Sequence, residues 1–262
     1  QFIDTFSDDT KLGTQTTVDR ISGYVASVYS VSATGKFVSD SNTSFLLHSD
    51  ATDGNTTFTD SSSNTHTISQ GASGGCEHST DYPPPSYLGA TAIHGNGSGF
   101  LYAAGSSDWN FGTGDWTIEF WQYVNGTAPA GDRSISWGAG GTKEIFIRPK
   151  WTDADWIRIY EQDGKGSSTW AAGSYGSDPS QGNWTHLAYT RDGTTLRYYV
   201  NGVHQTAGGV YPLTWGADYN TFTASLPLDI LGSTPNGEYA ASNVYLTEIR
   251  ISKGICRYPS GT

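Results

Sequence analysis

The chain has 262 residues and a formal net charge of −11, and only 15% of its residues are charged. This length suits one large β domain or two small ones. Such an acidic chain repels a phosphate backbone, which argues against sequence-independent binding to DNA or RNA. No apolar run reaches the roughly 18 residues that a membrane-spanning helix needs. We therefore expect no nucleic-acid partner and no membrane insertion, and the charge favours a cation or a neutral ligand.

The first 40 residues differ in composition from the remainder. They contain no Trp, Pro or Asn and consist of Ser/Thr-rich phrases with β character, such as Tyr24–Tyr29. We interpret 1–40 as an extended N-terminal arm or connector and 41–262 as the body. The alternative, that 1–40 supplies the first strands of the same domain, stays equally open. The complete lack of Met suggests a processed or internal piece of a longer product.

The body alternates short apolar runs with Gly, Asn, Asp and Pro, which is typical of strands and turns. The run 116–121 has period two, which places Trp116, Ile118 and Phe120 on one face and Thr117, Glu119 and Trp121 on the other. Asn201-Gly202 is a strong signal for a tight hairpin turn. Further strands are predicted at 144–148, 155–160, 184–189, 196–200, 228–231 and 244–251, with the last two pairing.

No segment shows sustained helical periodicity, so the pattern predicts an all-β fold with two antiparallel sheets packed as a sandwich or jelly roll. Period-two placement also predicts which side chains point into the core. These inward residues are Ile118, Phe120, Leu187, Tyr189, Leu196, Tyr198 and Ile249.

Five motifs in chain order resemble the laminin-G-like, concanavalin-A-like jelly rolls. They cover roughly residues 45–258 and lie at Phe45–Asp50 with Phe58–Ser62, Gly112–Trp121, Gly182–Gly193 with Leu196–Gly202, Leu228–Gly232 and Leu246–Gly254. Arg257-Tyr258 resembles a tail found in virion and tail proteins of marine bacteriophages. The resemblance implies a concanavalin A-like jelly roll, but this fold hosts lectins, adhesins, virion proteins and enzymes.

The sequence offers little for catalysis. Jelly-roll glycosidases place their carboxylates in a Glu-x-Asp-x-x-Glu run on one strand face, and this chain has no such run. We therefore expect no enzyme, although carboxylates from different strands would reopen the question. His48 and His186 are interpreted as hydrogen-bonded structural residues. Trp116, Trp121 and Trp184 belong to the family motifs and are expected in the core.

Two kinds of ligand are expected from the resemblance. Jelly rolls of this type commonly hold Ca²⁺ at a loop rim, and oxygen ligands for it are available from Asp50, Asp53, Asp60 and Asn64. The alternative is that Asp60 and Asn64 only cap turns. Sugar binding is the usual non-enzymatic use of the fold, and aromatic residues outside the motifs are its candidates. These are Trp151, Trp156, Trp170, Tyr175, Trp215 and Tyr219, whose alternative role is packing under loops or between subunits.

The jelly-roll topology also suggests a disulfide. Early strands and the final strand lie side by side in it, so Cys76 and Cys256 become candidate partners. A bond would suit a protein that works outside the cell. Two separate buried thiols are the equal alternative.

We therefore expect a non-enzymatic virion protein of a bacteriophage on the virion surface: a tail fibre, spike or capsid-decorating subunit. It would bind host-surface glycans, contact other virion subunits and form a homo-oligomer in which repeated weak sites give avidity. The alternatives are a purely structural virion or filament subunit, a secreted bacterial lectin or adhesin, and a polysaccharide-degrading enzyme.

Overall fold

The computed structural model describes residues 18–21, 24–27, 35–72, 75–126, 132–137, 144–147, 157–160, 180–206, 213–214, 226–232 and 240–259. The described chain is almost entirely β, with one short 3₁₀ helix, η2 (Ser107–Trp109). All strand pairings are antiparallel, apart from one isolated parallel bridge, which confirms the predicted fold class. No helix within the described ranges is long and apolar enough to cross a membrane.

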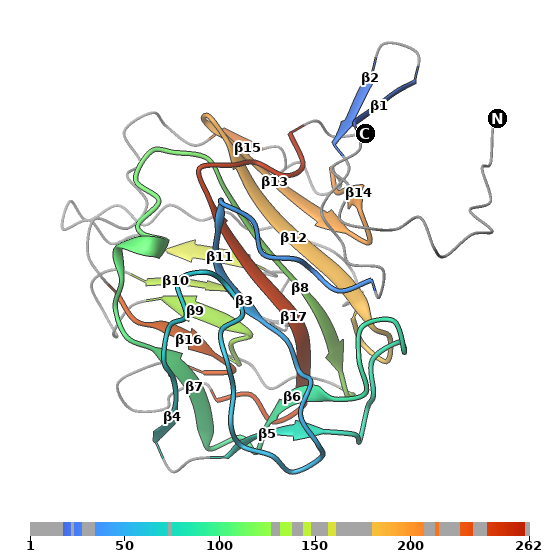
Figure 1. Cartoon of the computed structure of the whole chain (residues 1–262), viewed down its shortest axis with the longest axis vertical. Helices are drawn as coiled ribbons and strands as arrows, with labels where there is room; N and C mark the ends of the chain where they lie inside the picture. The colour runs from blue at the N-terminus through green and yellow to red at the C-terminus, as the bar shows by residue number, and fades with distance from the viewer. Residues whose placement is uncertain are drawn as a thin grey trace.

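A six-stranded sheet forms one layer. Its order is β11-β10-β9-β16-β7-β4. In Figure 1 it occupies the lower left of the molecule, from β11 to β4. The strands are β4 (Ile68–Ala72), β7 (Gly99–Ala103), β9 (Ile135–Trp137), β10 (Glu144–Ile147), β11 (Ile157–Tyr160) and β16 (Leu228–Ile230).

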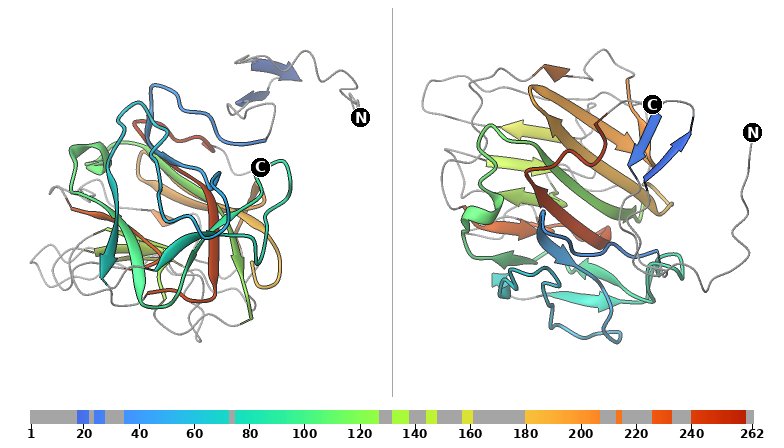
Figure 2. Two further views of the ribbon diagram at one scale, coloured as in Figure 1. Left: turned by 60° about the horizontal axis from the view of Figure 1, so that its bottom comes forward. Right: turned by 45° about the horizontal axis from the view of Figure 1, so that its top comes forward.

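A nine-stranded sheet forms the other layer, with the order β14-β13-β12-β8-β17-β6-β5. β6 pairs with the first part of β17, and β3 pairs with a later part of the same strand. β15 pairs with β13. Figure 2 shows this sheet from two further directions. Its strands are β3 (Thr43–Leu47), β5 (Cys76–Ser79), β6 (Ala92–Gly95), β8 (Trp116–Val124), β12 (Thr185–Asp192), β13 (Thr195–Val200), β14 (Val203–His204), β15 (Leu213–Thr214) and β17 (Val244–Lys253).

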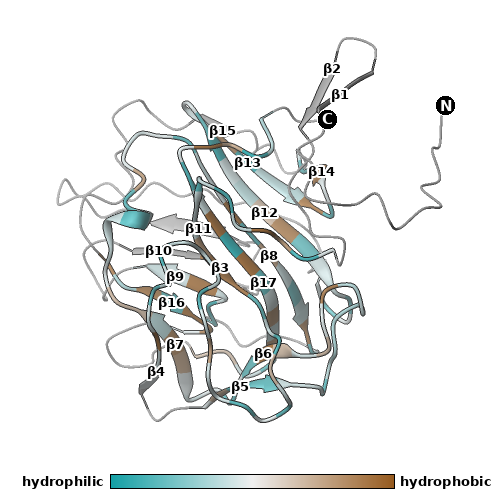
Figure 3. Cartoon of the chain, viewed as in Figure 1, coloured by the Kyte–Doolittle hydropathy of each residue, from teal (hydrophilic) through white to brown (hydrophobic). Residues whose placement is uncertain are grey.

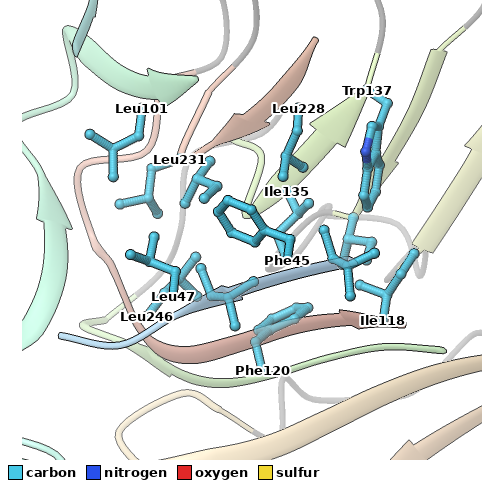
Figure 4. Packing of buried hydrophobic residues seen from close by; sticks show 14 of the residues in the cluster. Phe45, Leu47, Leu101, Ile118, Phe120, Ile135, Trp137, Leu228, Leu231 and Leu246 are labelled. Atoms are coloured by element: carbon cyan, nitrogen blue, oxygen red, sulfur yellow. The ribbon is translucent and has the colours of Figure 1, made fainter. Parts of the chain in front are cut away.

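The core lies between the two sheets, and Figure 4 shows their side chains pointing at one another. Phe45, Ile118 and Phe120 of the large sheet meet Ile135 and Leu228 of the small one in a single buried cluster. All seven residues predicted to point inward belong to this cluster. Figure 3 shows the cause along β12 and β17, where hydrophobic and hydrophilic residues interleave.

One expectation about organisation needs correction. The predicted pair 228–231 and 244–251 does not form, because β16 lies in the small sheet and β17 in the large one. Phe37, which belongs to the predicted arm, is buried, and its backbone N–H donates to the Glu248 carboxylate. Within the arm, β1 (Val18–Ile21) and β2 (Tyr24–Ser27) pair with each other as a separate two-stranded sheet.

Candidate functional site

The outer face of the large sheet, which is turned away from the small sheet, collects the polar residues of three family motifs. Glu119 on β8 lies in register with Arg250 on β17 and with Ala188 on β12. His186 lies two residues before Ala188 on β12, on the same face, and is paired with Trp121 of β8. Motifs that are 60 or more residues apart therefore meet on one patch of this face.

Glu119 is the centre of a buried network. Its Oε1 accepts a hydrogen bond from Arg250 Nε at 2.8 Å and lies 2.7 Å from Arg250 Nη2. Its Oε2 accepts the Tyr258 hydroxyl at 2.8 Å and lies 3.3 Å from His186 Nε2. Burial alone would raise the pKa of Glu119, but the charge of Arg250 and the bonds from His186 and Tyr258 lower it to about 2. Glu119 is therefore a fixed anion.

Both ends of the body cover this network. The Phe37 ring lies 4.3 Å from the Arg250 guanidinium carbon, in a cation–π arrangement. From the other end of the body, Arg257 donates from Nη2 to both Asp40 carboxylate oxygens at 2.8 Å. Burial opposes ionisation of Asp40, yet Arg257 and neighbouring donors lower its pKa. The motif residues thus fasten the tail to the sheet, and Glu119 has no exposed surface that a substrate would reach.

A second buried carboxylate, Glu248, lies where β17 shifts register. Its φ of 51° is unusual for a residue that is not glycine and marks a bulge. Oε2 accepts the Phe37 N–H at 2.7 Å, and Oε1 lies 2.7 Å from His48 Nδ1. The hydrogen-bonded, structural role predicted for His48 is confirmed. His186 is held by its backbone, whose N–H donates to Asn201 Oδ1 at 2.9 Å.

An aromatic row crosses the same face near one end of the sheet. Tyr123 on β8 is in register with Tyr245 on β17, which is in register with His94 on β6. Trp184 precedes β12 at the level of Tyr123, because Thr185 pairs antiparallel with Gln122, the residue before Tyr123 on β8. Paired residues share a face, so we call Trp184, Tyr123, Tyr245 and His94 the aromatic row. Its span over four strands is about 14 Å at about 4.8 Å per strand.

The rings of the row contact one another and a proline-rich loop. His94 and Tyr245 stack with centroids 4.3 Å apart, and Tyr123 lies 5.9 Å from Trp184. Tyr82, from the loop after β5, stacks on Tyr123 at 4.8 Å. The indole Nε1 of Trp184 donates to the Pro83 carbonyl at 3.0 Å, which fixes that loop beside the row.

The row is partly open to solvent. Tyr245 is buried, whereas Tyr82, Tyr123, Trp184 and His94 are only half-buried. Half-buried rings held by their neighbours are rigid apolar surfaces with polar edges, the kind of surface on which a sugar ring stacks. This is the most ligand-like surface in the described part of the chain.

The sequence did not single out this row. Trp116 is buried as predicted, but Trp121 and Trp184 are half-buried on the outer face and do not lie in the core. The usable signal was the period-two phase of β8, which puts Trp121 and Tyr123 opposite Phe120. The sugar-binding candidates Trp151, Trp156, Trp170, Tyr175, Trp215 and Tyr219 all lie outside the described residues.

The residues expected to bind Ca²⁺ have separate partners. Among the described residues no three His, Cys, Asp or Glu side chains are grouped to hold a metal ion. Asp50 pairs with the Lys36 ammonium, and Asp53 accepts the Thr80 N–H. Asp60 accepts the N–H groups of Leu46 and Ser62, and its bond to the Ser62 N–H is the turn-capping bond of the alternative interpretation. The Asn64 amide instead donates to β3, at the Ser44 carbonyl.

Asp60 also belongs to a clasp around one histidine. His66 Nδ1 lies 2.7 Å from Asp60 Oδ2, and His66 Nε2 lies 2.8 Å from Asp108 Oδ2. The imidazole ring also packs 4.7 Å from the buried indole of Trp109. The carboxylates therefore tie the 60–66 turn to η2.

Cys76 and Cys256 are free, so the expected disulfide is not formed. Cys76 on β5 lies opposite Gly95 on β6, and β6 meets β17 near Tyr245, at the beginning of that strand. Cys256 follows the opposite end of β17. About ten strand residues therefore separate the thiols, which is roughly 30 Å at about 3.3 Å per residue.

Comparisons with known proteins agree with this architecture. A sequence model described as the concanavalin A-like lectin/glucanases superfamily (Laminin_G_3) matches residues 95–254. No curated protein matches the sequence.

Among solved structures, domain 4 of AbnA is similar with a TM-score of 0.58 and 14% identity, over 83% of this chain and 96% of that one. AbnA is a GH43 extracellular arabinanase from Geobacillus stearothermophilus, and that domain was solved with arabinotriose.

Two more distant structures share the fold over part of their length. Botulinum neurotoxin type C, which depends on two ganglioside molecules to enter cells, has a TM-score of 0.54 and 12% identity, over 83% of this chain and 50% of the toxin chain. Trypanosoma rangeli sialidase in complex with sialic acid has a TM-score of 0.53 and 14% identity, over 96% of this chain and 35% of the sialidase. At such identities the likeness establishes the fold alone.

Proposed function

This chain belongs to the concanavalin A-like lectin/glucanases superfamily, and we propose that it is a non-enzymatic glycan-binding module of a bacteriophage virion protein. The observation that carries the proposal is the aromatic row with its half-buried rings. The arabinanase domain and the toxin named above are bound to or dependent on sugars, which supports a glycan as the ligand class.

The row suits reversible binding to an oligosaccharide. Its rings are held by stacking and by the bond from Trp184 to Pro83, so little side-chain entropy is lost when a ligand docks. The row is longer than one sugar ring, so a chain of sugars makes better use of it than a monosaccharide. Weak single contacts suit a subunit that is present in many copies on a particle.

The carboxylates of the same face support binding in preference to catalysis. Glycoside hydrolysis needs one carboxyl that gives up a proton and a second that meets the sugar. Glu119 is held ionised by Arg250, and it is fully buried beneath Phe37 and Tyr258. Glu248 is likewise fully buried and bonded to His48 and to the backbone of Phe37.

The virion assignment rests on the Arg257-Tyr258 tail. Those two residues fasten the tail over the network, Arg257 through Asp40 and Tyr258 through Glu119. A domain whose two ends are fastened together resists unravelling where it is joined to a larger assembly. An antibody raised against the body should label intact particles of the phage that encodes this chain, and particles without label would exclude a surface position.

A glycan array followed by titration calorimetry tests the binding function. Trp184→Ala and Tyr82→Ala should each weaken the best array ligand by about tenfold or more, as for an aromatic anchor. Tyr102→Ala is the matched control, because Tyr102 is a half-buried tyrosine on β7 in the opposite sheet.

Lack of binding to any glycan by the unaltered protein would leave the purely structural role. Equal binding by Trp184→Ala and the unaltered protein would move the site away from the aromatic row.

A further inference from the structure

We infer that the aromatic row binds glycans composed of neutral or amino sugars and discriminates against glycans that carry uronic or sialic acids. This inference rests on the proposed glycan-binding function and specifies its ligand class. It follows from two carboxylates that flank the row, Glu77 and Asp81.

Both carboxylates are placed by elements that build the row. Glu77 on β5 is in register with His94 and continues the line of the row by one strand. Asp81 immediately precedes Tyr82, the ring that stacks on Tyr123. Both side chains are exposed, and no ion pair within the described ranges involves either of them. No described cation therefore offsets them where a ligand would dock.

The field of these carboxylates reaches the middle of the row. Burial raises the pKa of Tyr245 to about 12, and Asp81 and Glu77 add to the increase together with neighbouring tyrosines. In addition to burial, these two carboxylates disfavour a phenolate at Tyr245, as they would disfavour a ligand carboxylate. The charge at this surface is thus felt by its rings and is not confined to the rim.

The described cations of the outer face are committed to other acids. Lys36 pairs with Asp50, Arg250 with Glu119, and Arg257 with Asp40. Pairing cancels most of their field outside the immediate contact. The row is therefore negative overall in the part of the chain that the structure describes.

The chemistry of the ligand follows from this charge. A carboxylate accepts hydrogen bonds from sugar hydroxyls and pairs with an ammonium group, and these charge-assisted bonds are stronger than neutral ones. A sugar carboxylate beside Glu77 or Asp81 is repelled. For two exposed charges about 4 Å apart in water, the repulsion corresponds to about a fivefold loss of affinity.

The test compares the unaltered protein with the Glu77→Gln/Asp81→Asn double variant on one array of neutral, amino-sugar, uronic-acid and sialylated glycans. The unaltered protein should bind neutral and amino-sugar glycans at least about fivefold better than their acidic counterparts at about 0.01 M salt, where the Debye length is about 30 Å. The preference should shrink at about 1 M salt, where that length is about 3 Å. In the double variant, acidic glycans should gain about fivefold while neutral glycans stay within about twofold.

Asp115→Asn is the matched control for a lost carboxylate, because Asp115 accepts the Gly193 N–H at 2.7 Å, a bond that an asparagine oxygen can retain. Asp115 immediately precedes β8, eight residues from Tyr123 and thus about 26 Å away, and its replacement should leave the preference unchanged. Equal or better binding of acidic glycans by the unaltered protein would overturn the inference and leave the proposed function intact. Absence of binding to every glycan would overturn the proposed function itself.

Discussion

Arg250→Met tests whether the buried network stabilises the fold. Methionine retains an apolar stem under Phe37 but removes the guanidinium that holds Glu119 through Nε and Nη2. Glu119 would then remain fully buried beside His186 and Tyr258, and its nearest remaining guanidinium would be that of Arg257, with Nε 3.9 Å from Oε1. Removing one partner of a buried ion pair costs about 3–5 kcal/mol, because the other charge is left uncompensated. We expect a loss of this size in the free energy of unfolding.

Urea unfolding followed by tryptophan fluorescence measures this loss. For a domain of this size, about 4 kcal/mol lowers the melting temperature by roughly 10 °C. Arg197→Met is the matched control, because Arg197 pairs with Asp192 in a partly exposed ion pair at 3.0 Å. Exposed pairs contribute about 0–1 kcal/mol, so the control should change stability by less than about 1 kcal/mol.

The pH dependence gives a second signature. The pKa of Glu119 in the folded state, about 2, lies below its ordinary value of 4.5. The network therefore stabilises the fold fully above about pH 4.5, and this contribution is lost as the pH falls towards about 2. The stability gap between the unaltered protein and Arg250→Met should shrink over that window. A gap under about 1 kcal/mol at pH 7, or one that does not change with pH, would refute the reasoning.

Three further predictions concern other parts of the chain. Burial raises the pKa of Asp132 to about 7 from 3.8, so its ionisation destabilises the fold as the pH rises between these values. The stability of Asp132→Asn relative to the unaltered protein should therefore increase from pH 4 to pH 8, by at most about 4 kcal/mol. Parallel pH profiles of the two proteins would contradict this. Burial raises the pKa of the Cys76 thiol to about 12, so Cys76 should resist iodoacetamide at pH 8 while folded; after unfolding without reductant, mass spectrometry should find both Cys76 and Cys256 alkylated, which a disulfide would prevent. EDTA should leave the melting temperature unchanged, because Asp60 is already occupied by backbone donors; a lower melting temperature would restore a Ca²⁺ site.

Local alternation in the sequence was enough to locate strands such as β8, β12 and β13 and to orient their side chains, although it did not single out β4–β7 or β9. In β8, period two alone assigned Ile118 and Phe120 to the core and Glu119 to the outer face, as the structure has them. The hairpin turn at Asn201-Gly202 was also predictable, because both residues adopt the positive φ that this turn requires. Such features depend on neighbours within a few residues, so the sequence carries them directly.

Pairing partners and the candidate site depended on contacts between distant segments. The sequence suggested that 228–231 pairs with 244–251, but the sheet to which each strand belongs is decided by packing of the whole sandwich. For the same reason Cys76 and Cys256 lie towards opposite ends of the large sheet. Alternation along a strand predicts which face of the sheet each side chain points to, but it does not predict which other strand is the hydrogen-bonded neighbour.

The sequence by itself determined that this chain is an antiparallel β-sandwich, where strands such as β8 and β12 lie and which of their side chains face the core, because those features depend on period two and turn chemistry. Only the tertiary structure brought Glu119, Arg250 and Tyr258 into one buried network and aligned Trp184 with Tyr123 and Tyr245 in one aromatic row. The physical reason is that register across strands fixes both groupings, and register is set cooperatively by the turns and the hydrophobic faces of all strands together.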